Sequence, residues 1–171
     1  MMILISGGNG SGKSAYAEKL ASTMSVPRYY IATMVSQSEE NERRIEKHRR
    51  QRSGLGFVTI EEPCRVSRAV IEPASLVLLE DASNLLGNMI FAEHGTKEDA
   101  LQEILELQKK CRQLLVVTIS GLPADAYEGE TAEYIRAMEW LNEQLFAASD
   151  VVVELHSGTP ECRKGGLDEI S

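Results

Sequence analysis

The sequence predicts an α/β fold in which a mainly parallel β-sheet is covered by helices on both faces. Segments of strand character alternate with segments of helical character along most of the 171 residues, which is the order that builds parallel sheets. Several strand segments, among them SLVLLE and QLLVVTIS, are continuous apolar runs. Such runs are typical of strands buried on both faces.

The first half of the chain supplies three predicted strands and two helices. Residues 2–6 are a short apolar run that ends at glycines, and residues 13–24 follow with a helical pattern. The segment RYYIATM is β-branched and aromatic, which favours a strand that ends near Thr33. Residues 38–52 are highly charged, and we expect a helix with Ser38 as its N-cap and Ile45 as its main apolar contact. GFVTIEEP predicts a third strand, closed by Pro63.

The second half continues the alternation. Residues 66–71 are expected to form a short helix, and SLVLLE a strand that ends at Glu80 and Asp81. Residues 82–92 are largely apolar, and residues 97–111 carry leucine and isoleucine at helical spacing. QLLVVTIS predicts a strand, residues 131–148 a helix, and DVVVEL the last strand. The length suits one domain, residues 1–171, with the segment from about residue 157 expected to be peripheral.

The segment GGNGSGKS carries the clearest chemical signal, because it matches G-x-x-x-x-G-K-[ST] between a predicted strand and a predicted helix. Glycines let the backbone wrap closely around phosphates and point N–H groups at them. Lys13 would reach the β- and γ-phosphates, and the Ser14 hydroxyl would ligate Mg²⁺. We therefore predict a P-loop NTPase-like protein that binds ATP or GTP; the alternative is a chance glycine-rich turn. The predicted nucleotide-binding residues of this loop are Gly7, Gly8, Asn9, Gly10, Ser11, Gly12, Lys13 and Ser14.

A second part of such a site is an acid at the end of a neighbouring strand. LVLLED supplies Glu80 and Asp81 at that place. Because side chains alternate along a strand, the two carboxylates cannot both point the same way. We predict that Glu80 is linked to Mg²⁺, although acids at strand ends are also common as simple solvated residues.

The segment ERRIEKHRRQR gathers six of the eighteen Lys and Arg residues around His48, although the chain has a formal net charge of −8. On a helix, Arg44, His48 and Arg52 are spaced i, i+4, i+8 and share one face. Neighbouring cations favour the neutral imidazole, which is a competent nucleophile, and the arginines could neutralise a triphosphate. The alternative is a solvated helix face with weak surface ion pairs.

These segments together resemble a known family. MMILISGGNGSGKSAYAEKL, YYIAT, RIEKHRRQR, FVTIEEP and VLLED followed by NMIF are similar, in consecutive order over residues 1–91, to bifunctional adenosylcobinamide kinase/adenosylcobinamide-phosphate guanylyltransferases. The similarity resumes in LNEQLFAASDVVVELHSG. In that family a histidine takes GMP from GTP, expels pyrophosphate and passes GMP to a phosphorylated corrinoid. The resemblance implies this role for His48, phosphate binding for residues 7–14, the strand-end acid for Glu80, and a homotrimer.

Two departures from the family pattern leave other functions open. Residues 118–121 read TISG where the family has Asn-Glu-Val-Gly, and Arg136 is one residue out of step in its helix. One of the two half-reactions could therefore be lost. The alternatives are another small-molecule P-loop kinase, in which the basic helix closes over phosphates, and a catalytically reduced nucleotide-binding regulator.

Composition excludes several other classes of function. The acidic balance argues against a nucleic-acid binder, which needs an extended basic surface. No apolar run is long enough to span a bilayer, and MMILISGG lacks the basic leader of a signal peptide. The three cysteines have no metal-binding spacing and are expected to be reduced thiols, so we predict a cytoplasmic protein. His94 and His156 are interpreted as ordinary surface residues.

Overall fold

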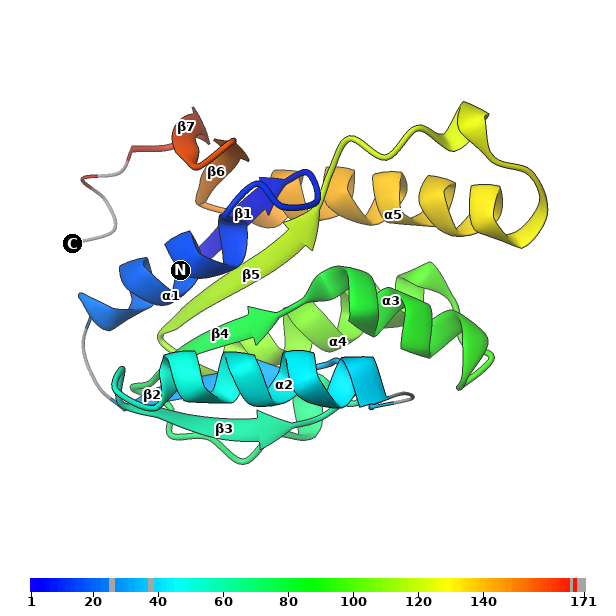
Figure 1. The fold of residues 1–171 in the computed structure, drawn as a ribbon. Helices are drawn as coiled ribbons and strands as arrows, with labels where there is room; N and C mark the ends of the chain where they lie inside the picture. The colour runs from blue at the N-terminus through cyan, green and yellow to red at the C-terminus, as the bar shows by residue number, and fades with distance from the viewer. Residues whose placement is uncertain (25–26, 37–38, 167, 169–171) are drawn as a thin grey trace.

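A computed structural model of the chain describes residues 1–24, 27–36, 39–166 and 168. It contains a seven-stranded sheet with the order β3-β2-β4-β5-β1-β6-β7 (Figure 1). The strands are β1 (Met2–Gly7), β2 (Arg28–Ala32), β3 (Phe57–Glu61), β4 (Leu76–Glu80), β5 (Gln113–Ile119), β6 (Val151–His156) and β7 (Thr159–Lys164). The α-helices are α1 (Lys13–Ser22), α2 (Glu39–Arg52), α3 (Ala82–Phe91), α4 (Lys97–Lys110) and α5 (Gly129–Ala148), and the short 3₁₀ turns are η1 (Val66–Arg68) and η2 (Ala124–Ala126).

Strands β1 to β6 run parallel to their neighbours, and β7 pairs antiparallel with β6. Helices α1 and α2 lie on one face of the sheet, and α4 and α5 lie on the other (Figure 1). The predicted fold class is therefore confirmed. None of the helices in the described residues is long and apolar enough to cross a membrane.

Each face of the sheet has its own apolar core, because side chains alternate along the strands. On the α1 face, Ala17 and Ala21 pack with inward-facing residues of β1, β5 and β6. On the opposite face, α3, α4 and α5 contribute fully buried residues such as Leu85, Ile104 and Leu141. The parallel strands are thereby held rigidly, with their carboxyl ends at one edge of the sheet.

Helix α2 is polar around almost its whole circumference, with Ile45 as its main apolar residue, as the sequence predicts. Acidic residues fill its first turn and arginines its last turn, which suits the helix dipole at both ends. Glu46 also accepts a hydrogen bond of 3.0 Å from Arg50 one turn later, a pairing that supports an exposed helix weakly. The expected N-cap, Ser38, lies outside the described residues.

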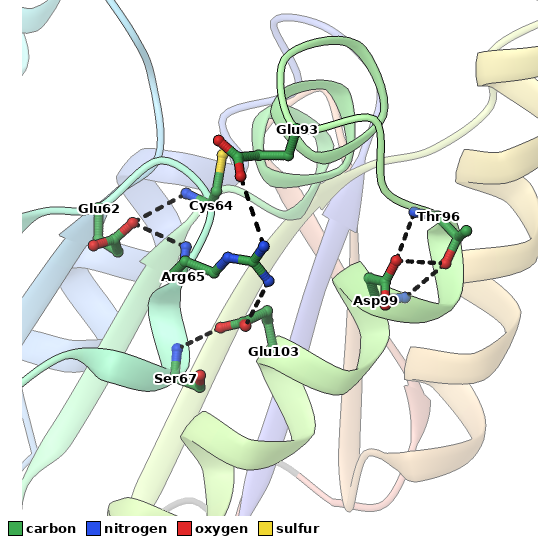
Figure 2. Close-up of polar contacts among 8 residues, drawn as sticks. All are labelled: Glu62, Cys64, Arg65, Ser67, Glu93, Thr96, Asp99 and Glu103. Atoms are coloured by element: carbon green, nitrogen blue, oxygen red, sulfur yellow. Dashed lines mark hydrogen bonds and ion pairs between the residues drawn. The ribbon is translucent and has the colours of Figure 1, made fainter.

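The turn after β3 is tied to α4 and to the segment between α3 and α4 by polar contacts (Figure 2). The Glu62 carboxylate accepts hydrogen bonds from the backbone N–H groups of Cys64 and Arg65. The Arg65 guanidinium in turn lies 3.6 Å from the Glu93 carboxylate and 3.7 Å from the Glu103 carboxylate. Helix α4 begins with a capping box in which Thr96 and Asp99 exchange hydrogen bonds. These contacts join the turn after β3 to α4 and to the segment just before it.

One expectation about the strands is wrong, because DVVVEL is followed by a further strand, β7. Ser157 and Gly158 form the connecting turn with φ values of 49° and 84°, as two-residue hairpins require. The Ser-Gly pair was the available signal, but TPECRK carries a proline and charges and shows no apolar alternation. The structure also shortens the helix expected at residues 66–71 to the single turn η1.

Candidate nucleotide-binding site

Residues 7–14 form a tight loop between β1 and α1 at the carboxyl edge of the sheet (Figure 1). Gly10 and Gly12 adopt left-handed φ values of 70° and 87°, which only glycine takes without strain. The Lys13 ammonium donates a 3.2 Å hydrogen bond to the Gly8 carbonyl across the loop. Helix α1 has no side-chain cap, so the N–H groups of its first turn are available to an anion.

Strand β6 and the β6–β7 turn press directly against this loop. A Cβ at Gly7 would lie 2.4 Å from Ser11 Oγ and 2.9 Å from the Leu155 carbonyl oxygen. The Gly158 N–H donates a 2.8 Å hydrogen bond to the Ser11 carbonyl. The loop is therefore shaped by residues far away in the sequence as well as by its own glycines.

The side chains of the two predicted metal ligands, Ser14 and Glu80, are in direct contact. The Ser14 hydroxyl donates a 2.6 Å hydrogen bond to Glu80 Oε1, while Glu80 Oε2 is buried with no partner among the described residues. Burial raises the pKa of Glu80, and the neighbouring Asp81 raises it further, against the opposing effects of Ser14 and Lys13. A buried carboxylate oxygen without a partner, beside a serine hydroxyl, fits a hard cation such as Mg²⁺.

Asp81 turns away from Glu80 and caps α3, where its carboxylate accepts the Asn84 N–H at 2.7 Å. Burial raises the pKa of Asp81, while hydrogen bonds from the first turn of α3 lower it. Among the described residues no group of three or more His, Cys, Asp or Glu side chains is arranged to hold a metal ion. A Mg²⁺ at Ser14 and Glu80 would therefore share its coordination with phosphates and waters, as Mg²⁺ commonly does.

The structure brings His48 of α2 to the phosphate loop. A cavity of about 280 Å³ separates them and is lined by Gly10, Gly12, Lys13, Ser14, Ala15, Glu18 and His48. His48 also borders a second cavity of about 440 Å³ beneath α2, together with Tyr30, Ile45, Arg52 and Glu80 among others. The half-buried imidazole thus stands between the loop and a second space large enough for part of a ligand.

The two predicted arginines are placed differently from the histidine. Arg52 is 5% exposed and lies with its guanidinium carbon 3.6 Å from the centroid of the Tyr30 ring. It lines the larger cavity and not the one at the phosphate loop. Arg44 belongs to α2, but its side chain lies outside the described part of the chain. Asn9 is exposed at the tip of the loop.

Sequence reasoning missed several residues that shape the site. Glu18 is 8% exposed and faces the loop cavity; its spacing of four residues from Ser14 on one helix was the available signal. Thr33 is fully buried, and its hydroxyl lies 3.0 and 2.9 Å from the carbonyl oxygens of Glu80 and Asp81. Asn88 donates a 2.7 Å hydrogen bond to the Thr33 carbonyl. The sequence alone does not reveal which groups Thr33 and Asn88 bind, because their partners lie far away along the chain.

The end of β5, where the sequence departs from the family pattern, has a polar brace of its own. The Thr118 hydroxyl donates a 2.6 Å hydrogen bond to Asn142 Oδ1, and Asn142 Nδ2 donates one of 2.8 Å to the Ile119 carbonyl. Thr118 is fully buried. Helix α5 therefore holds the carboxyl end of β5 beside the phosphate loop.

Comparisons with known proteins give a consistent result. Residues 3–162 match the family described as cobinamide kinase / cobinamide phosphate guanyltransferase. The chain is 30% identical over 173 residues to the bifunctional adenosylcobalamin biosynthesis protein CobP of Pseudomonas aeruginosa, with 96% of this chain and 98% of that protein covered. It is 29% identical over 177 residues to the bifunctional adenosylcobalamin biosynthesis protein CobU of Escherichia coli K12, with 92% and 97% covered.

A solved structure from Pyrococcus horikoshii OT3, PH0250, has a TM-score of 0.55 to this chain at 7% sequence identity, covering 99% of this chain and 89% of the other. At so low an identity this likeness concerns the fold alone.

Proposed function

Because the chain belongs to the cobinamide kinase / cobinamide phosphate guanyltransferase family, we propose that it carries out both reactions of that name. In the first, a corrinoid side-chain hydroxyl takes the γ-phosphoryl group of a nucleoside triphosphate. In the second, GMP passes from GTP to the corrinoid phosphate through His48. The observation that carries the proposal is the cavity in which His48 faces Lys13 and Ser14.

The phosphate loop binds the triphosphate in both reactions. The uncapped first turn of α1 offers its N–H groups and its dipole to the phosphates. Lys13 exchanges its hydrogen bond to Gly8 for the phosphate oxygens. In the kinase reaction the acceptor hydroxyl oxygen bonds to the γ-phosphorus and its proton passes to solvent. The bond from the γ-phosphorus to the bridging β-phosphate oxygen breaks, and the nucleoside diphosphate leaves with that electron pair.

We propose Mg²⁺ as the cofactor, held by Ser14 and Glu80. When bound, it would neutralise negative charge on the phosphates. The unpartnered Glu80 Oε2 and the Ser14 hydroxyl are the donors that support this assignment.

In the guanylyl transfer a neutral ring nitrogen of His48 attacks the α-phosphorus of GTP. A phosphorus–nitrogen bond forms, the bond to pyrophosphate breaks, and pyrophosphate leaves with the electron pair. An oxygen of the corrinoid phosphate then attacks the same phosphorus, the phosphorus–nitrogen bond breaks, and His48 is regenerated. Positioning of the imidazole beside the loop is what the protein must supply for this step.

The test is the mass of the intact protein after incubation with GTP and Mg²⁺. Wild type is expected to gain an acid-labile GMP adduct, His48→Ala to gain none, and Lys13→Ala to gain much less. His94→Asn is the matched control, because His94 is exposed and its φ of 53° suits asparagine; it should be modified like wild type. If wild type binds GTP but is not modified, His48 does not have the proposed role. The protein would then be better explained as another small-molecule P-loop kinase, in which the basic helix closes over phosphates, or as a nucleotide-binding regulator.

A further inference from the structure

Arg52 is the last residue of α2, and its environment differs from that of three other arginines described on this helix. Arg43, Arg49 and Arg50 have side chains that are 83, 49 and 79% exposed, whereas Arg52 as a residue is 5% exposed. A buried arginine is costly unless specific contacts compensate for its lost hydration. The contacts of Arg52 therefore indicate what it does.

One contact is with the sheet. The Arg52 guanidinium lies over the face of Tyr30, with 3.6 Å between its central carbon and the ring centroid. Tyr30 is 2% exposed and packs edge-on against Phe57 at 5.9 Å between ring centroids. The guanidinium therefore rests on a ring that is itself fixed in the core, a geometry worth more when desolvated than at the surface.

A second, longer-range influence reaches α1. Glu18 is 8% exposed, and the positive charge of Arg52 lowers its pKa against the raising effect of burial. Glu18 also lines the loop cavity together with Ser14 and His48. Arg52 thus joins α2 to strand β2 through the Tyr30 ring, and its charge is felt by Glu18 on the helix that follows the phosphate loop.

His48 lies four residues before Arg52 on the same helix, and both border the larger cavity beneath α2. Because the two residues lie about one turn apart on one helix, holding Arg52 in place restricts where the backbone at His48 can lie. Among the described residues, the Arg49–Glu61 pair also ties α2 to β3, but it is exposed and is expected to contribute little. The exposed Arg50–Glu46 pair lies within α2 and does not anchor it.

We propose that Arg52 is a positioning residue: buried and stacked on Tyr30, it holds α2 so that His48 borders the phosphate loop. The proposal rests on the proposed function only in one of its tests, the rate of His48 guanylylation. A direct phosphate ligand would border the loop cavity, whereas Arg52 borders the larger cavity and has one face covered by an aromatic ring. Its Nε–H is buried without a hydrogen-bond partner among the described residues, so a measurement of GTP affinity is needed to separate positioning from phosphate binding.

The first test measures GTP affinity separately from the rate of His48 guanylylation at saturating GTP, in Arg52→Met, Arg52→Lys and Arg50→Met. Arg52→Met is expected to guanylylate about 10- to 100-fold more slowly, the size of effect that misplacing a reacting group causes, with GTP affinity within about twofold of wild type. Arg52→Lys keeps the charge without the planar stack and should fall between. Arg50→Met, an exposed neighbour on the same helix, should match wild type in both measurements.

The proposal is overturned if Arg52→Met binds GTP as weakly as Lys13→Ala while keeping its rate at saturation, because Arg52 would then be a phosphate ligand. It is also overturned if neither quantity changes. Tyr30→Phe keeps the ring and should behave as wild type, and Tyr30→Leu should reproduce the slow rate of Arg52→Met. Melting temperatures of all variants identify any that fail to fold, and the lysine and phenylalanine variants are mild enough to decide the question alone.

A second readout does not require guanylyl transfer. Diethyl pyrocarbonate modifies accessible imidazoles, and bound GTP should protect His48 from it in wild type and in Arg50→Met. At saturating GTP, protection should be lost in Arg52→Met. If wild type is protected but never guanylylated, the proposed function fails while the positioning role of Arg52 is still tested; equal protection in Arg52→Met would overturn the latter.

Discussion

Replacing Gly7 by alanine should destabilise the protein, although alanine is ordinarily compatible with the φ of this residue. The added methyl group would lie 2.4 Å from Ser11 Oγ and 2.9 Å from the Leu155 carbonyl oxygen. The hydroxyl can rotate, but the carbonyl belongs to strand β6 and cannot yield cheaply. Overpacking of this kind costs about 1–3 kcal/mol, offset by about 0.4–1 kcal/mol because alanine restricts the unfolded chain. The expected net loss is about 1–2 kcal/mol, or a fall of about 2–8 °C in Tm.

The neighbouring glycine provides the matched control. A Cβ on Gly8 meets no atom within 4 Å, so Gly8→Ala should unfold within about 0.5 kcal/mol of wild type. Its methyl group would stand on the surface of the phosphate loop, and we therefore expect weaker GTP binding in this variant. The pair separates folding from binding: Gly7→Ala loses stability, and Gly8→Ala loses affinity at unchanged stability.

The assay is urea denaturation without nucleotide, followed by calorimetric titration with GTP at a temperature where both variants are folded. Adding Ser11→Ala to Gly7→Ala removes the closest clash but leaves the Leu155 carbonyl, so stability should recover only in part. Equal stability of Gly7→Ala and wild type, or an equal loss in Gly8→Ala, would refute the close packing described for the loop and β6.

Three further outcomes follow from the structure. At pH 8, alkylation should label the exposed Cys162 first, because burial raises the pKa of Cys111 to about 11; this leaves about 100-fold less thiolate at Cys111 than its ordinary value would give. Peptide mapping by mass spectrometry measures the order, which should disappear in urea, and equal labelling of the folded protein would contradict it. Thr96→Ala removes the cap of α4 and should cost about 1 kcal/mol in chemical denaturation, a loss that intact stability would disprove. Asn142→Leu leaves the buried Thr118 hydroxyl without its acceptor and should cost about 1–3 kcal/mol; adding Thr118→Val should restore part of it, and strictly additive losses would argue against the brace.

The sequence predicts best the features that depend on local pattern. The phosphate loop, its flanking strand and helix, and the strand-end position of Glu80 were all expected, because a strand, a glycine turn and a helix N-terminus follow one another in the chain. The opposite directions of Glu80 and Asp81 were also foreseen, since the first meets Ser14 and the second caps α3.

Features that depend on tertiary packing could not be predicted in the same way. Nothing local distinguishes Arg52 from the other arginines of α2, because its burial depends on where the Tyr30 ring lies in β2. The spacing from Ser14 places Glu18 on the face of α1 near the loop, but its burial to 8% exposure depends on tertiary packing around α1. Strand β7 is not predicted from the sequence, because it lies at the edge of the sheet and is almost wholly exposed. Such an edge strand carries charged residues and lacks the apolar alternation by which strands are recognised.

The place of β1 in the sheet has a consequence for protein synthesis. Its hydrogen-bonded neighbours are β5 and β6, residues 113–119 and 151–156, and the turn that closes on the loop comes at Gly158. A ribosome therefore makes the phosphate loop, residues 7–14, well before the strands that support it, residues 113–119 and 151–156. Until then β1 is an apolar segment with no partner, of the kind that chaperones bind. Nucleotide can find its site only after the second neighbour of β1 has been translated and paired.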